Sequence, residues 1–213
     1  MKAQMSVISV VLISGIVIAL VGAAYMWGVP LIEKRSVMAE FQTAKSFVFN
    51  LNERMVDIAN SGAGRESMDI PNGLVRVIPE NSNDPDNNSI ILEFGVNQPM
   101  VFNQTPVYLG GATFEDVINE VGTYGISSPG VISMTSVKDP LGYIMKIKLH
   151  FRELDTKTVP QRGYKIVLDT PTSAIETGTS TITVSFVKTE TLQNACCGNA
   201  GPLVSSHILV ETA

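Results

Sequence analysis

The stretch that decides the fold is MSVISVVLISGIVIALVGAAYMWGVPLI, from Met5 to Ile32, in which no side chain is charged. It is longer than the roughly 20 residues that an α-helix needs to cross the hydrocarbon core of a bilayer. Tyr25 and Trp27 stand near its far end, where aromatic residues favour the membrane interface. Charged residues follow at 33–35 and mark the return to water. We therefore expect one helix that holds the chain in a membrane.

After residue 35 the apolar pattern becomes periodic. Apolar residues recur in steps of four and three, the spacing of one face of an amphipathic helix: Val37, Phe41, Ala44, Val48, Leu51, Met55 and Ile58. That face could cover the chain's own strands or a neighbouring helix; we expect the strands, because a half-apolar sheet needs a cover. Pro30 kinks a helix without necessarily ending it. Residues 4–60 are thus predicted to form one bent helix.

The rest of the chain consists of short apolar runs separated by turn residues. Residues 61–72 are expected to be a linker, and 114–121 one or two helical turns. Predicted strands are 74–78, 89–96, 107–109, 131–137, 143–151, 164–168, 179–187 and 204–210. No βαβ alternation occurs, which argues against a doubly wound sheet. The predicted fold class is α+β: a long N-terminal helix with a mainly antiparallel, β-sandwich-like domain over residues 73–213.

Charge and motifs narrow the function classes. The formal net charge is −5, and the 15 Lys and Arg residues are scattered. A nucleic-acid partner is not expected, because neutralising phosphates requires clustered cations. The chain contains no Gly-x-Ser-x-Gly, His-Glu-x-x-His or P-loop spacing. We therefore expect no catalytic residues, no cofactor and no metal centre.

The two cysteines, Cys196 and Cys197, are adjacent in the sequence, so they cannot join distant parts of a domain. The simplest interpretation is a pair of small buried or loop residues. A vicinal disulfide in a turn is the next alternative. A metal pair is the least favoured, because tetrahedral sites usually need Cys-x2-Cys spacing and further ligands.

Three polar stretches are candidate surface sites. Asn87 and Asn103 each begin an Asn-x-Ser/Thr tripeptide and are candidate glycosylation acceptors. The oxygen-rich loop 84–88 could bind calcium, although it lacks the Gly and the terminal Glu of an EF-hand. Acidic residues at 115, 116 and 120 are best explained as the solvated face of a short helix.

The first residues carry a further pattern. Lys2 and Ala3 precede Gln4, and Ser6 and Leu12 follow it. Residues 2–12 thereby resemble the class III signal peptide of archaeal type IV pilin-like proteins, in which a basic and a small residue precede Gln-x-Ser-x-Glu-x-x-x-Leu. The resemblance implies that a prepilin peptidase cuts between Ala3 and Gln4, so that residues 1–3 are a leader and the apolar helix stays on the mature protein.

One position departs from that family pattern. The family's Glu would fall at position 8, where this chain has Ile8. In related pilins the acid pairs with a neighbouring subunit's free N-terminus during assembly. Its replacement argues against efficient polymerisation into a long filament, and it fits a minor pilin, or a pilin-like protein that stays in the membrane, at least as well as a major subunit. In an assembly, we expect helix–helix contacts at Ile8, Leu12, Gly15, Gly22 and Pro30. The two glycines are included because small residues let membrane helices approach closely.

The resemblance implies a structural function. The expected protein is a subunit of a type IV pilus-like surface filament that associates with its own copies or other pilin-like subunits, served by a prepilin peptidase and a membrane assembly platform. It would lie in membrane lipid before assembly and at the cell surface afterwards. The first alternative is an accessory anchor that binds the cell envelope without polymerising. Less favoured are a tethered enzyme or solute-binding module, and a plain anchored domain.

Overall fold

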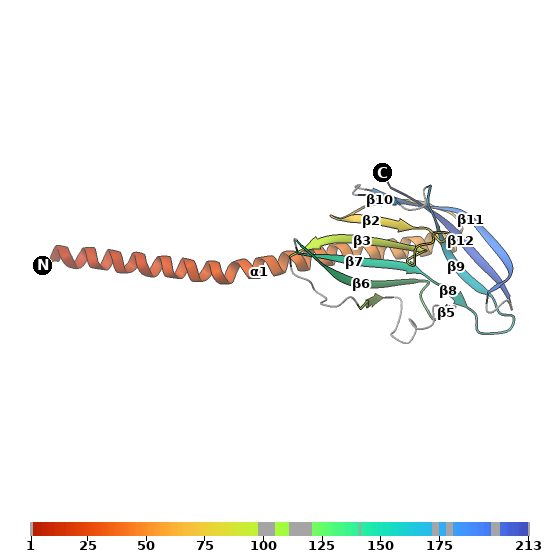
Figure 1. Ribbon diagram of the computed structural model, residues 1–213, viewed down its shortest axis with the longest axis horizontal. Helices are drawn as coiled ribbons and strands as arrows, with labels where there is room; N and C mark the ends of the chain where they lie inside the picture. Colours follow the sequence, from red (N-terminus) through yellow and green to blue (C-terminus); the bar gives the residue numbers. More distant parts are fainter. Residues whose placement is uncertain are drawn as a thin grey trace. The chain divides into compact units, whose positions relative to one another are not determined.

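The computed structural model describes residues 2–97, 105–110, 121–140, 142–171, 175–177, 181–196 and 201–212. One helix, α1, runs from Lys2 to Ser61 and continues through Pro30 (Figure 1). The chain divides into two compact units, Met1–Phe41 and Gln42–Ala213. The second unit, which we call the β-domain, thus begins inside α1, whereas the prediction placed the whole helix in front of it.

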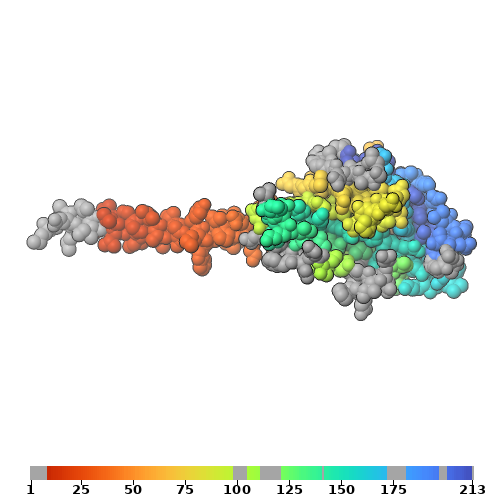
Figure 2. Space-filling model, viewed as in Figure 1, coloured from red at the N-terminus to blue at the C-terminus, as the bar shows by residue number. Residues whose placement is uncertain are grey.

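The first unit is the apolar part of α1. Its helix is long and apolar enough, by length and composition, to cross a membrane. Of the large apolar side chains from Val10 to Ile32, all but the half-buried Val29 are exposed, by between 52% and 87%. Figure 2 draws the described part of this segment in red to orange. A helix that is apolar all round requires a non-aqueous cover.

The β-domain contains two sheets of six strands each. Sheet A has the order β1 (Arg65–Asp69), β11 (Thr181–Cys196), β12 (Gly201–Thr212), β9 (Gly163–Asp169), β8 (Glu153–Asp155) and β5 (Val121–Thr123). Sheet B has the order β10 (Ile175–Thr177), β2 (Leu74–Ile78), β3 (Ser89–Val96), β7 (Gly142–Phe151), β6 (Gly130–Asp139) and β4 (Val107–Gly110). Only β12–β9 and β5–β8 pair in parallel among the described strands. The predicted α+β class with a mainly antiparallel, sandwich-like domain is confirmed.

The end of α1 supplies part of the β-domain core. Leu51 and Met55 are 0% exposed, and Ala44, Val48 and Ile58 of the predicted stripe are also buried. Ser206 of β12 donates a hydrogen bond to the Ala59 carbonyl at 3.3 Å. At Gly110 of β4, an added Cβ would stand 2.9 Å from the Phe49 ring. The segment therefore contacts both sheets, as expected of a helix that covers its own strands.

Two stripe residues lie in the first unit. Val37 is half-buried there and Phe41 is buried. The stripe prediction also omitted Phe47 and Ala59, which are buried as well. The four-and-three spacing selects the centre of a buried face, and residues on its margins need the partner sheets to decide their burial.

The predicted linker over residues 61–72 needs correction, because it contains β1. This strand is polar, with the sequence RESMD and alternating exposed and half-buried residues. It pairs along sheet A with β11, from Arg65 opposite Ser185 to Asp69 opposite Thr181. A half-exposed edge strand buries too little apolar surface to produce an alternating hydrophobic signal.

The other strand predictions agree with the structure to different degrees. β2 and β3 have the predicted bounds, whereas β8 and β10 were missed because each has only three residues. β11 extends to Cys196, beyond the predicted end at residue 187. The predicted helical turns at 114–120 lie outside the described residues, and Val121 belongs to β5 rather than to a helix.

Candidate functional site

The main candidate surface is the exposed apolar segment of α1, residues 9–32. Among the predicted contact positions, Leu12 is 60% exposed, and nothing lies within 4 Å of a Cβ added at Gly15 or Gly22. Pro30 is exposed as well. The side chains of Ala3, Gln4 and Ile8 lie outside the described residues. The surface can therefore accept either lipid or the closely packed helix of another chain.

Cys196 ends β11 and is 1% exposed. It is disulfide-bonded. A Cβ added at Gly163 of β9, the strand on the other side of β12, would lie 2.6 Å from the Cβ of Cys196, so the Cys196 side chain packs against the β9 backbone. Cys197 lies outside the described residues, so the vicinal pairing stays a prediction.

The first glycosylation candidate is engaged in local hydrogen bonds. Nδ2 of Asn87 donates to the carbonyl of Glu80 at 3.4 Å. The third residue of the tripeptide, Ser89, is 0% exposed and donates its hydroxyl to the Asp86 carbonyl. A glycan on Asn87 would have to displace the bond to Glu80, which disfavours this acceptor in the folded domain. Asn103 lies outside the described residues.

The oxygen-rich loop 84–88 has its carboxylates opposite cations. Asp86 pairs with Lys148 at 2.9 Å, and Asp84 faces Arg76 at 3.9 Å. Asp84 also accepts a hydrogen bond from the Asp86 amide. Among the described residues, no group of three or more His, Cys, Asp or Glu side chains could hold a metal ion. The loop geometry is that of an ion-paired turn.

A polar cleft of about 470 Å³ lies beside this loop, lined by β6, β7 and neighbouring segments. Two of its lysines are already paired, Lys148 with Asp86 and Lys165 with Glu80 at 2.6 Å. His150 Nδ1 lies 3.2 Å from the Asn87 carbonyl. The two lysines and their carboxylates neutralise one another in pairs, and this arrangement resembles a structural ion-pair network more than a set of groups aimed at a substrate.

Burial, and secondarily the Lys148 ammonium, lower the pKa of His150. The folded state thus favours neutral imidazole, while the unfolded chain titrates near pH 6.5. The contribution of His150 to stability is complete above that pH and declines as the pH falls towards the folded pKa. We expect the melting temperature to fall between pH 7.5 and 5.5, and to fall less in His150→Gln, measured by circular dichroism. Parallel curves for both proteins would contradict this assignment.

A second histidine joins three strands of sheet A. His207 Nδ1 of β12 lies 2.8 Å from an oxygen of Asp169 in β9, and its Nε2 lies 3.6 Å from Glu190 of β11. Lys188 pairs with Glu190 at 2.9 Å, and that hydrogen bond raises the pKa of Lys188 and lowers the pKa of Glu190. A His–Asp pair occurs in catalytic sites, but here the second ring nitrogen faces a carboxylate. The geometry links strands rather than activating a nucleophile.

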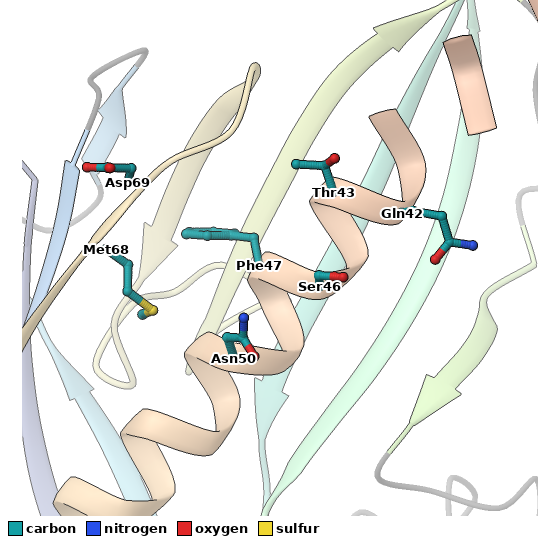
Figure 3. A pocket seen from close by; sticks show the side chains of 7 residues that line it. All are labelled: Gln42, Thr43, Ser46, Phe47, Asn50, Met68 and Asp69. Atoms are coloured by element: carbon teal, nitrogen blue, oxygen red, sulfur yellow. The ribbon is translucent and has the colours of Figure 1, made fainter. Parts of the chain in front are cut away.

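A shallow groove of about 530 Å³ runs between α1 and β1 (Figure 3). Its walls are Gln42, Thr43, Ser46, Phe47 and Asn50 of the helix, with Met68 and Asp69 of the strand. Figure 3 shows the ring of Phe47 directed towards the side of the strand, while the Gln42 side chain points away from it. Among the described lining residues, Phe47 and Met68 have the apolar side chains, and the groove is too open to enclose a small ligand.

Sequence reasoning missed Asn88, a buried polar residue of the β-domain. It is 1% exposed and has a positive φ of 53°, which Asn tolerates better than most residues. Its Nδ2 donates to the carbonyls of Phe151 and Ile166, both at 2.8 Å, and its Oδ1 accepts from the amide of Leu168 at 2.9 Å. Asn88 thereby ties the end of β7 in sheet B to β9 in sheet A. Its position in a polar loop gives no sequence signal for this role.

Comparisons with known proteins add no assignment to these features. No protein-family model, no curated protein and no solved structure matches the chain.

Proposed function

We propose that this protein is a structural subunit of a type IV pilus-like surface filament, assembled through its N-terminal helix. The observation that carries the proposal is the apolar surface of residues 9–32, exposed on all faces of a helix that continues into the β-domain. Lipid covers that surface before assembly, and the helices of neighbouring subunits cover it afterwards. In this role the chain is not an enzyme.

The helix surface suits contact with other helices. Without a hydrophobic driving force inside lipid, membrane helices associate by close packing, which small residues permit. Gly15 and Gly22 leave open surface along the helix. Association at these positions would bring helix backbones together, with Leu12 packing beside them. The subunit's partners would be its own copies or other pilin-like subunits.

The N-terminal residues support the same proposal. Lys2, Ala3, Gln4, Ser6 and Leu12 match the leader pattern of pilin-like proteins. Cleavage before Gln4 by a prepilin peptidase would leave the whole apolar segment on the mature chain, ready for a membrane assembly platform. The β-domain would then make lateral contacts, adhere to surfaces or touch the cell envelope.

Ile8 favours a second candidate function. Where the family has an acid that pairs with a neighbour, this chain has an aliphatic residue. A subunit without that pair loses one specific contact for polymerisation. The alternative is therefore a membrane-anchored accessory protein of a surface appendage, which binds the cell envelope without forming a filament itself.

Replacement of Ala3 tests the proposal. We expect Ala3→Phe to block cleavage, because the peptidase pattern requires a small residue before Gln4. The variant would keep residues 1–3, visible by intact mass, and surface filaments labelled with an antibody against the β-domain would disappear from electron micrographs. Ala3→Ser keeps a small residue and serves as the matched control. Normal filaments on cells that make only Ala3→Phe would refute the proposal, and cleaved wild-type protein found only as single molecules would favour the accessory role.

A further inference from the structure

Two loops of the β-domain emerge at the same end of sheet A. The turn after β5 and the loop between β8 and β9 are neighbours, because β5 and β8 pair in parallel with Thr123 opposite Asp155. The Tyr124 amide donates to the Asp155 carbonyl at 2.9 Å and joins the two loops at their base. The teal hairpin at the lower right of Figure 1 is the β8–β9 loop. We call these two loops, residues 124–129 and 156–162, the tip.

The tip presents the most exposed aliphatic side chains of the described β-domain. Val159 is 94% exposed and Ile126 is 86% exposed, while Tyr124 beside them is 56% exposed. The next most exposed aliphatic residues of that domain, Val187 and Leu192 of β11, reach only 49% and 45%. Burying these tip side chains would be favourable, so their full exposure in two adjacent loops indicates a contact surface.

Both loops are held by hydrogen bonds, so the exposure is built into the backbone. In the first turn, the amide of Ser127 donates to the Thr123 carbonyl at 2.8 Å, and the Ser127 hydroxyl accepts from the Thr123 amide at 3.0 Å. In the second, Thr156 and Arg162 exchange two bonds, of 3.0 and 2.9 Å. A preorganised surface loses little conformational freedom when it binds.

Cations flank the apolar side chains. Lys157 and Arg162 are exposed on the second loop. Beside them Asp155, at the end of β8, is the one carboxylate among the described residues from 155 to 162, and it accepts a hydrogen bond from the Lys157 amide at 3.1 Å. This excess of positive charge at the tip contrasts with the net charge of −5 of the whole chain. The tip therefore combines aliphatic side chains, a tyrosine and an attraction for anions.

We propose that the tip docks on an anionic lipid bilayer, with Ile126 and Val159 inserted between headgroups. Two narrow loops are too small for a standard protein interface, which buries about 800 Å² on each partner. A bilayer needs no matching pocket, and accepts aliphatic side chains, an interfacial tyrosine and headgroup-binding cations together. Several copies of the tip, held together on one assembly, would bind a bilayer more tightly than one copy, because their weak individual affinities combine. The inference goes beyond the proposed filament and does not depend on polymerisation.

A vesicle-pelleting assay tests the proposal. Full-length protein is held in nanodiscs, which occupy the apolar part of α1, and is mixed with sucrose-loaded vesicles of phosphatidylcholine with or without phosphatidylglycerol. We expect the loaded nanodiscs to pellet with the anionic vesicles, more strongly at low salt. Ile126→Ser combined with Val159→Ser should weaken pelleting by about tenfold or more. Lys157→Glu should remove most of the preference for phosphatidylglycerol.

Matched controls separate the tip from other exposed apolar residues. Val187→Ser combined with Leu192→Ser removes two aliphatic side chains from β11 and should leave pelleting unchanged. Empty nanodiscs, which carry no protein of this kind, should remain in solution. The inference is overturned if wild-type nanodiscs do not pellet, or if the β11 variant loses as much binding as the tip variant. It is also overturned if tip residues make nanodiscs associate with one another without vesicles, which would identify a second copy as the partner. Filament assembly should be normal in the tip variant, so this failure is distinct from failure of the proposed function.

Discussion

Surface filaments should be lost when Leu20 is replaced by Lys. Leu20 lies near the middle of the apolar segment and is 65% exposed. A lysine at the centre of a membrane helix costs about 2.5–3.5 kcal/mol on insertion scales. The same ammonium would remain among apolar helices in an assembled filament, where every subunit would carry it. The lysine is therefore unfavourable both in the membrane and in the assembled filament, and we expect a defect in membrane retention and in assembly.

Electron microscopy of sheared surface fractions and membrane fractionation measure this effect. Leu192→Lys, a similar change at a half-exposed position of β11, is the matched control and should leave filaments unchanged. Leu20→Met keeps an apolar side chain and should also leave filaments unchanged. Wild-type numbers of filaments built from the Leu20→Lys protein would show that residues 9–32 do not form the apolar core of an assembly.

The largest loss of stability should follow from replacing Asn88 by Leu. The change removes three side-chain hydrogen bonds and leaves two carbonyls and one amide buried without their partner. Each unsatisfied buried group costs about 1–3 kcal/mol, so we expect destabilisation of roughly 3–5 kcal/mol. The positive φ of 53° adds to the cost, because Leu adopts this conformation less readily than Asn. For a domain of this size the melting temperature should fall by about 10 °C.

Denaturant titration followed by circular dichroism measures the change for the β-domain in detergent-held protein. Asn83→Leu, at an exposed position of the same loop, is the control and should change the stability by no more than about 0.5 kcal/mol. Asn88→Asp loses both donated bonds and places a buried carboxylate oxygen against the carbonyls of Phe151 and Ile166, so at neutral pH it should destabilise at least as much as Asn88→Leu. Equal stability of the Asn83 and Asn88 variants would contradict the bridging role of Asn88.

Much of the fold follows from local pattern. The uncharged run and the four-and-three spacing predict α1 within one or two residues at each end, because both signals are set by the helix's own geometry. The bounds of β2 and β3 were predicted correctly, since both strands are strongly apolar and mostly buried between polar loops. Such runs specify their element before any partner is known.

Other features depend on partners that are distant in the sequence. β1 is a strand because its backbone pairs with β11, and the polar sequence RESMD contains no pattern that predicts this pairing. The parallel pairing of β5 with β8 creates the tip, and no local pattern fixes which strands lie side by side. Asn88 resembles any other loop asparagine until the carbonyls of Phe151 and Ile166 come within reach. Local periodicity therefore predicts elements, whereas bridging residues and docking surfaces require the tertiary structure.

The central claim is that the apolar segment of α1 remains part of the working protein. The most direct measurement is the N-terminal sequence and intact mass of native protein sheared from the cell surface. We predict a mature chain that begins at Gln4 and keeps the whole apolar run, recovered in assemblies that require detergent to dissociate. A free monomer, soluble without detergent and beginning after Trp27, would contradict it.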